Sequence, residues 1–149
     1  MAGTAALSKV LHIRENEKTR AQKAYQKSID DFEEVATQLY ELLRKKEAAE
    51  SLYETYLQQS SPIGKIREQA LYIENLKKQI IALQQEVQHA RSEMESKHED
   101  LSEAYVEVKK FEKVIEHREE EAAALIKKDE KDSMDEISIR QYLSRKTGD

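Results

Sequence analysis

A seven-residue apolar repeat runs through the second half of the chain, and it constrains the fold more than any other feature. The repeat occupies Ile66, Ile73, Ile80, Val87, Met94, Leu101, Val108 and Ile115. A second set follows three residues later, at Leu76, Leu83, Ala90, Ala104 and Phe111. Sustained heptads of this kind are typical of helices that supercoil around a partner helix. A helix packed on a globular body would instead follow a 3.6-residue period and carry a wider apolar face.

The first half carries a matching stripe, whose positions alternate steps of four and three residues. They are Leu7, Leu11, Arg14, Lys18, Ala21, Tyr25, Ser28, Phe32, Val35, Leu39, Leu42, Lys46, Ala49, Tyr53 and Tyr56. Only Arg14, Lys18, Ser28 and Lys46 interrupt its apolar or aromatic character. The chain therefore holds two stripes that can pack against each other.

The two stripes are separated by the sequence Ser60-Ser61-Pro62-Ile63-Gly64. Proline lacks the amide proton that continues a helix, and glycine can adopt positive φ. We therefore predict that the chain folds back here, which sets Leu57 near Lys65 and Tyr25 near Lys97. The predicted fold is all-α: a long antiparallel two-helix coiled-coil hairpin with a short C-terminal helical segment.

We predict one domain, 1–149, with helices over about 5–59 and 65–128, a hinge at 60–64 and a C-terminal segment at 129–149. The apolar repeat stops after Leu125, and Ser133 to Glu136 has the pattern of a capping box that would begin a short terminal helix. That helix would carry Met134, Ile137, Tyr142 and Leu143. These residues have no stripe to join, so they either fray in solvent or dock on a partner.

Composition excludes several classes of function. Charged residues make up 37% of the chain and aromatic residues 6%, which leaves too little apolar material for a thick globular core. The net charge of -5 comes from interleaved signs, with no basic stripe for nucleic acid. The glycines stand alone, so no phosphate-binding loop is expected, and no apolar run is long enough to span a bilayer. Any membrane association would be through a partner.

With no cysteine, the chain has neither a disulfide framework nor a thiolate metal site, which fits a reducing compartment such as the cytoplasm. Two Glu-x-x-His pairs, Glu86 with His89 and Glu95 with His98, resemble the ligand pairs of di-iron bundles. Both pairs lie on one helix about 13 Å apart, so a solvated face is the better interpretation, with a metal site after self-association as the alternative. We expect no catalysis, cofactor or metal.

Polar residues in the stripes have two interpretations. Arg14, Lys18, Lys46, Lys97 and Arg118 can extend to the edge of the seam and pair with acids on the other helix. Alternatively, Arg14, Lys18 and Arg118 gather at the open end of the hairpin, where they would meet an acidic partner.

Tyrosines outside the seam are candidate contacts, because exposed aromatic residues are enriched at interface hot spots. Tyr40 is the clearest case, on the outer face. Tyr72 and Tyr105 flank the seam, where each ring either covers the core edge or contacts a partner.

The order of several segments along the chain resembles the FliJ family of the bacterial flagellar export apparatus. Leu7 to Lys18 (LSKVLHIRENEK) opens the likeness, and after the hinge come Arg67 to Leu76 (REQALYIENL), Val108 to Lys113 (VKKFEK) and Met134 to Ser138 (MDEIS). The likeness covers almost the full length. Residues 1–6 depart from it, since many members carry aromatic residues there.

This resemblance implies a non-catalytic stalk, cytoplasmic and peripheral to the membrane through its partners, that binds the ring of the flagellar export ATPase and the cytoplasmic domain of the export gate. Export chaperones are a further implied partner, and the alternative function is a generic coiled-coil chaperone or tether. The resemblance assigns Leu7, Leu11, Arg14, Ile137 and Tyr142 to the ATPase end, beside the basic residues Lys18 and Arg118. It assigns Tyr72 and Leu76 to the gate, although Leu76 also belongs to the seam.

Overall fold

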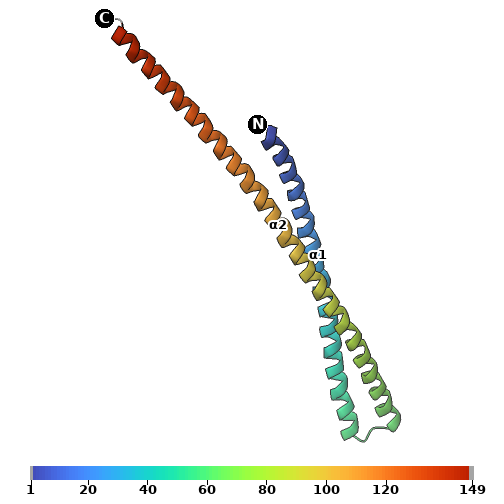
Figure 1. Ribbon diagram of the computed structural model, residues 1–149. Coiled ribbons are helices and arrows are strands. Elements are labelled where there is room, and N and C mark those ends of the chain that lie inside the picture. The colour runs from blue at the N-terminus through green and yellow to red at the C-terminus, as the bar shows by residue number, and fades with distance from the viewer. Residues whose placement is uncertain (1, 148–149) are drawn as a thin grey trace. The chain divides into compact units, whose positions relative to one another are not determined.

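The computed structural model describes residues 2–147, which form two helices (Figure 1). Helix α1 spans Ala2–Gln58 and helix α2 spans Ile63–Thr147, with no strand in the described part of the chain. The all-α prediction is confirmed, and both helices are longer than expected. Met1, Gly148 and Asp149, which the predicted domain includes, lie outside the described residues. Neither helix contains, within residues 2–147, a stretch long and apolar enough to cross a bilayer.

A helix-ending motif closes α1 before the chain turns into α2. The Ser61 amide donates to the Tyr56 carbonyl over 3.0 Å and the Ser60 amide to the Leu57 carbonyl over 3.4 Å, the bond pair of a Schellman motif. In such a motif the residue just past the helix end is left-handed, and Ser60 adopts this conformation with φ 50°. The predicted turn is therefore present, but its left-handed residue is Ser60 rather than a glycine, and Gly64 already lies in the first turn of α2.

The chain divides into two compact units, and both helices contribute to each. One unit is Lys18–Glu103, which contains the turn, and the other combines residues up to Glu17 with those from Ala104 onward. Each is described separately below. The assignment of a single domain stays a prediction.

In the unit Lys18–Glu103 the two helices are antiparallel, as a series of contacts across them shows. Lys65 Nζ lies 4.8 Å from the centre of the Tyr56 ring, and the rings of Tyr25 and His98 are 5.2 Å apart. Between them the Gln69 side-chain amide donates to the Ala49 carbonyl over 3.0 Å. The predicted alignment, Leu57 with Lys65 and Tyr25 with Lys97, is thus correct to within one residue.

The core of this unit is a narrow seam at the heptad positions. Ala49, Ile73 and Leu76 are buried together, with Leu42 and Tyr53 packed against them. Ser28 is the buried polar residue of the seam, and its hydroxyl donates to the Tyr25 carbonyl of the preceding turn over 2.6 Å. Because that local bond satisfies the hydroxyl, a serine can stand among apolar neighbours.

In the other unit, the first turns of α1 pack on α2 from Ala104 onward. Val108 is the buried residue here, at 3% exposure, and the Arg14 guanidinium lies 5.8 Å from the centre of the Phe111 ring. At the start of α1, a Cβ added to Gly3 would stand 3.0 Å from Arg118 Nη1. The pairing of α1 with α2 therefore ends near Arg118 because α1 begins there.

Beyond this point α2 continues without a helix beside it (Figure 1). Every described side chain from residue 123 to 147 is exposed, and we call this stretch the unpaired segment. Helical structure in the C-terminal segment is as expected. The separate start at Ser133 is wrong, because α2 runs through Ser133 to Glu136 without interruption and the capping-box pattern lies inside the helix.

Candidate protein-binding surfaces

The unpaired segment offers exposed apolar side chains over its whole length. Ile137 and Tyr142, two predicted contact residues, are 49% and 64% exposed. The other large apolar residues exposed in this segment are Leu125, Ile126, Met134, Ile139 and Leu143. An exposed helix with this many apolar side chains is typical of a surface that a partner covers.

The heptad positions of α2 change character where the unpaired segment begins. In the paired part, Val108 occupies such a position and is 3% exposed. The same positions further along the helix include Asp129, Asp132 and Glu136, which are all carboxylates. Leu125, Ile139 and Leu143 occupy other positions of the same series, so the apolar repeat is interrupted rather than replaced. Burying an unpaired charge is costly, and the three carboxylates therefore prevent a continuous apolar seam. The unpaired segment is therefore open to a partner whose surface differs from the apolar seam that α1 provides in the paired part.

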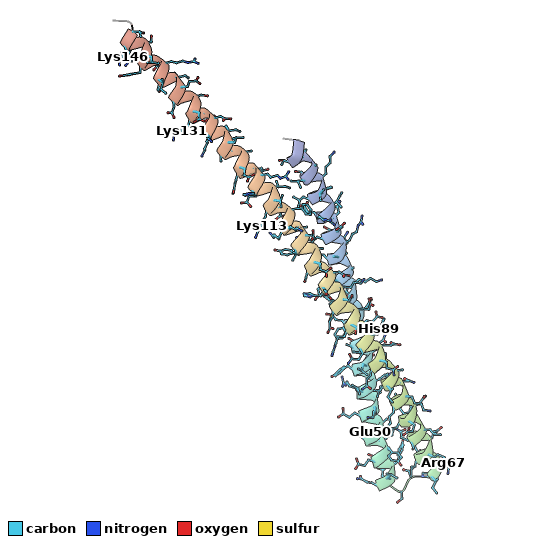
Figure 2. The ribbon with its side chains drawn as sticks, in the orientation of Figure 1. Glu50, Arg67, His89, Lys113, Lys131 and Lys146 are labelled. Atoms are coloured by element: carbon cyan, nitrogen blue, oxygen red, sulfur yellow. The ribbon has the colours of Figure 1, made fainter. Side chains whose placement is uncertain are left out.

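The last turns of the unpaired segment are basic. Residues 138–147 contain Arg140, Arg145 and Lys146 and no acidic residue. Arg140 Nη2 forms an exposed ion pair with Glu136 Oε1 over 3.2 Å. Figure 2 shows the side chain of Lys146 in these last turns of α2, and that of Lys131 before them. The segment thus carries carboxylates at three of its heptad positions and basic residues at its end.

A shallow hollow lies where the unpaired segment begins. It is lined by Gly3 and Thr4 of α1 and by Arg118, Glu121, Ala122 and Leu125 of α2. Arg118 is exposed here, as the prediction of a contact role requires. The start of α1 and the base of the unpaired segment therefore form one continuous surface.

The other predicted residues of this end belong to the seam. Leu7, Leu11 and Lys18 are half-buried, and so is Arg14. Arg14 Nη1 pairs with Glu17 Oε2 over 3.0 Å, whereas its Nε is buried without a hydrogen-bond partner among the described residues. Arg14 lies beside Phe111, and Arg118 lies beside Gly3. Gly3 and Arg14 are about 16 Å apart along α1 at 1.5 Å per residue, so Arg14 and Arg118 do not form the predicted cluster.

Tyr72 and Leu76, the predicted gate contacts, have different environments. Tyr72 is 46% exposed and lines a second hollow with Lys45, Ala48 and Leu52 of α1. Leu76 is 3% exposed and belongs to the core described above. In this conformation Tyr72 is available to a partner and Leu76 is a packing residue.

Tyr40 is exposed on α1, as expected. Its side chain is 60% exposed, and the Arg44 guanidinium lies 5.9 Å from the centre of its ring. An aromatic ring beside an arginine one turn away is a suitable contact surface, since both residue types are enriched at interface hot spots.

The two Glu-x-x-His pairs do not converge on a metal site. Glu86 and His89 lie along a groove that also contains Lys27 and Asp31 of α1, and the His98 ring packs on Tyr25. Within residues 2–147 no three His, Asp or Glu side chains are grouped so that they could hold a metal ion.

Sequence reasoning missed two exposed residues of α2, Leu71 and Ile81. They are 65% and 58% exposed, among the most exposed large apolar side chains in the unit Lys18–Glu103. Both residues belong to a second series of four- and three-residue steps along α2, which contains fewer apolar residues than the seam and was therefore not identified from the sequence.

Comparisons with known proteins agree with the resemblance. The family model described as flagellar FliJ protein matches residues 4–147. A curated Bacillus subtilis (strain 168) protein named flagellar FliJ protein is 37% identical over 143 residues, which cover 96% of this chain and 97% of that protein. No solved structure matches.

Proposed function

Because this chain belongs to the flagellar FliJ family, we propose that it is a non-catalytic stalk component of the flagellar protein export apparatus. Its partners are the ring of the export ATPase and the cytoplasmic domain of the export gate. The observation that carries the proposal is the unpaired segment, a helical stretch whose apolar side chains are all exposed. Export chaperones are a further partner of this proposal.

The ATPase contact involves the unpaired segment and the adjoining start of α1. Ile137 and Tyr142 supply exposed apolar area, and Arg118 supplies charge at the hollow beside Gly3. Leu7 and Leu11 support this surface from the seam, and Arg14 adds basic character to the same unit, about 16 Å from Arg118 along α1. A ring with an apolar and acidic inner surface would complement it.

The gate contact involves Tyr72 and the hollow that it lines. Tyr72 and Leu52 are exposed on different helices, so both helices take part in the surface. Tyrosine suits this role because its ring gives contact area and its hydroxyl can donate to a partner. Through these two contacts the chain would act at the cytoplasmic side of the membrane without entering it.

The first experiment measures ATP hydrolysis by the cognate export ATPase with the purified chain added. We expect stimulation that saturates, and we expect Ile137→Ser and Tyr142→Ser to reduce it at least about tenfold, as loss of an interface hot spot does. Tyr105→Ser is the matched control, since it removes a tyrosine 48% exposed from the paired part of the same helix. Absence of both binding and stimulation would contradict the proposal.

The second experiment measures binding to the purified cytoplasmic domain of the gate. Tyr72→Ser should weaken binding to the gate domain and leave ATPase stimulation unchanged. Tyr142→Ser should reduce ATPase stimulation and leave binding to the gate domain unchanged. If one substitution abolished both activities while circular dichroism stayed native, the assignment of two separate surfaces would be wrong.

A further inference from the structure

We propose that the outer face of α2 in the unit Lys18–Glu103 pairs with the same face of a second copy of this chain, in antiparallel orientation. The face carries a second heptad-spaced stripe, separate from the seam. Its positions are Arg67, Leu71, Glu74, Lys78, Ile81 and Gln85, in steps of four, three, four, three and four residues. Steps of this kind keep the residues along one line of a helix.

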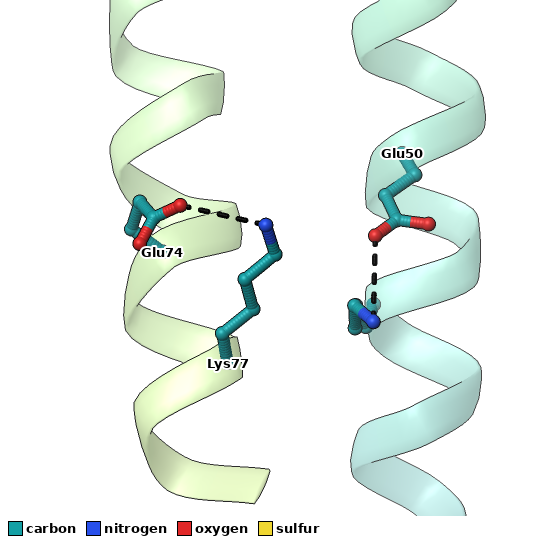
Figure 3. A network of polar contacts seen from close by, with 4 residues as sticks. Glu50, Glu74 and Lys77 are labelled. Carbon is teal, nitrogen blue, oxygen red and sulfur yellow. Dashed lines mark hydrogen bonds and ion pairs between the residues drawn. The ribbon is translucent and has the colours of Figure 1, made fainter. Parts of the chain in front are cut away.

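The stripe is open to a partner. Leu71 and Ile81 are 65% and 58% exposed, and neither belongs to the core of the unit. Glu74 makes one exposed ion pair, with Lys77 over 3.5 Å (Figure 3). Lys78 makes no hydrogen bond or ion pair within the described residues, so its charge is free for an interaction in trans.

The occupant follows from the symmetry of the stripe. We consider two antiparallel copies related by a two-fold axis at the level of residue 76. A residue that precedes residue 76 by a given number of positions then lies opposite the residue of the second copy that follows residue 76 by the same number. Leu71 then faces Ile81 of the second copy, and Glu74 faces Lys78 of that copy. Each contact occurs twice, as a two-fold interface requires.

The neighbouring positions fit the same axis. Arg67 faces Gln85 of the second copy, which brings no like charges together. An apolar pair and an opposite-charge pair therefore coincide at one axis position, and this self-complementarity favours a second copy over an unrelated partner.

The proposed interface is short, so we expect the dimer to have a low affinity. From Arg67 to Gln85 the stripe extends about 27 Å at 1.5 Å per residue. One helix pair of this length buries less than a standard stable interface, so we expect a dissociation constant on the order of 100 µM. The pairing is independent of the proposed export function, because it uses neither Tyr72 nor the unpaired segment.

Sedimentation equilibrium of the full chain, from about 10 to 1000 µM, tests the pairing around that expected dissociation constant. Wild type should pass from monomer to dimer over this range. Glu74→Lys and Lys78→Glu should each weaken the dimer at least about tenfold, since each places like charges opposite each other twice. An equimolar mixture of the two variants should dimerise again, because the lysines of one chain then face the glutamates of the other.

Leu71→Ser tests the apolar pair, and Val106→Ser is its control. Val106 is 61% exposed at the same heptad position of the helix, but it lies 21 residues beyond Gln85 and so outside the stripe, and its replacement should leave the dimer unchanged. Circular dichroism of each variant separates lost pairing from lost folding. A chain that stays monomeric up to about 1000 µM overturns the proposal. A dimer that the charge variants do not weaken, or a variant mixture that stays monomeric, overturns it equally.

Discussion

The part of α2 near the turn and the unpaired segment belong to one continuous helix, yet they are stabilised in different ways. Near the turn, Ile73, Leu76 and Ile80 are 3 to 8% exposed because α1 packs on them. In the unpaired segment the corresponding heptad positions include Asp129, Asp132 and Glu136. Helical backbone is therefore common to both regions, while tertiary packing is present in only one.

The comparison shows that α2 stays helical where its pairing with α1 ends, and that charged residues interrupt its apolar repeat there. Apolar residues at these positions remove surface from water when a second helix packs on them, which stabilises the pair. Carboxylates at the same positions would lose solvation without gaining a partner. An isolated helix in water is only marginally stable, so the unpaired segment depends on local interactions until a partner binds.

Amide hydrogen exchange should reveal the largest difference. Amides of residues 126–147 should exchange at least about a thousandfold faster than those of residues 70–90, because opening the unpaired segment breaks no tertiary contact. Mass spectrometry of peptic fragments measures both regions in one sample. Equal protection of the two regions would mean that the unpaired segment is already covered, for instance by another copy.

Replacement of Leu76 by alanine should destabilise the paired region by about 2 to 4 kcal/mol, since it leaves a cavity beside Ala49 and Ile73. Leu143→Ala is the matched control in the unpaired segment, where the side chain is 53% exposed, and it should change the free energy of unfolding by less than about 0.5 kcal/mol. Urea unfolding followed by circular dichroism measures both. Equal effects would remove the distinction between the two regions.

Much of the fold could be predicted because the positions of a heptad stripe are those that a second helix buries. Each seam position named from Leu7 to Tyr56 is buried or half-buried, and the same holds for those from Ile66 to Ile115. The turn was also located, since Pro62 interrupts helical hydrogen bonding. Its left-handed residue was not, because glycine is the usual choice there and the chain uses Ser60 instead.

Surfaces were harder to predict than the seam. Exposure of Tyr40, Ile137 and Tyr142 follows from their places outside the seam. The continuity of α2 through Ser133 did not, because a capping-box pattern can also occur inside a helix. Spacing likewise could not say whether Arg14 and Arg118 meet, since that depends on which α1 residue lies opposite each.

Arg14→Leu should stabilise the protein by about 1 kcal/mol. The substitution removes a buried Nε without a partner, whose cost is about 1 to 3 kcal/mol, and it loses a partly exposed pair with Glu17 and the contact with Phe111. Thermal unfolding measures the gain. If ATPase stimulation falls at the same time, Arg14 serves binding rather than stability, whereas a loss of stability would show that its ion pair outweighs the buried Nε.

Ser60→Gly should stabilise the turn by about 0.5 to 1 kcal/mol, because glycine adopts positive φ without the steric cost that serine bears. Ser61→Gly is the matched control, since no positive φ is found at that residue, and it should bring no gain. Urea unfolding compares the two. The effect should appear in the paired region alone, so hydrogen exchange of residues 126–147 should stay unchanged.

The smallest effect is expected for the ion pair between Arg140 and Glu136. Both side chains are mostly exposed, at 76% and 67%, so solvent screens the attraction. A double-mutant cycle with Arg140→Ala and Glu136→Ala should give a coupling of about 0.3 to 0.5 kcal/mol, measured as helix content of the segment against temperature. A coupling above about 1 kcal/mol would require a local environment of low dielectric, which an uncovered helix does not provide. Because one exposed pair is too weak to hold several helical turns in place, such a coupling would mean that a partner already covers the segment and supplies most of its order.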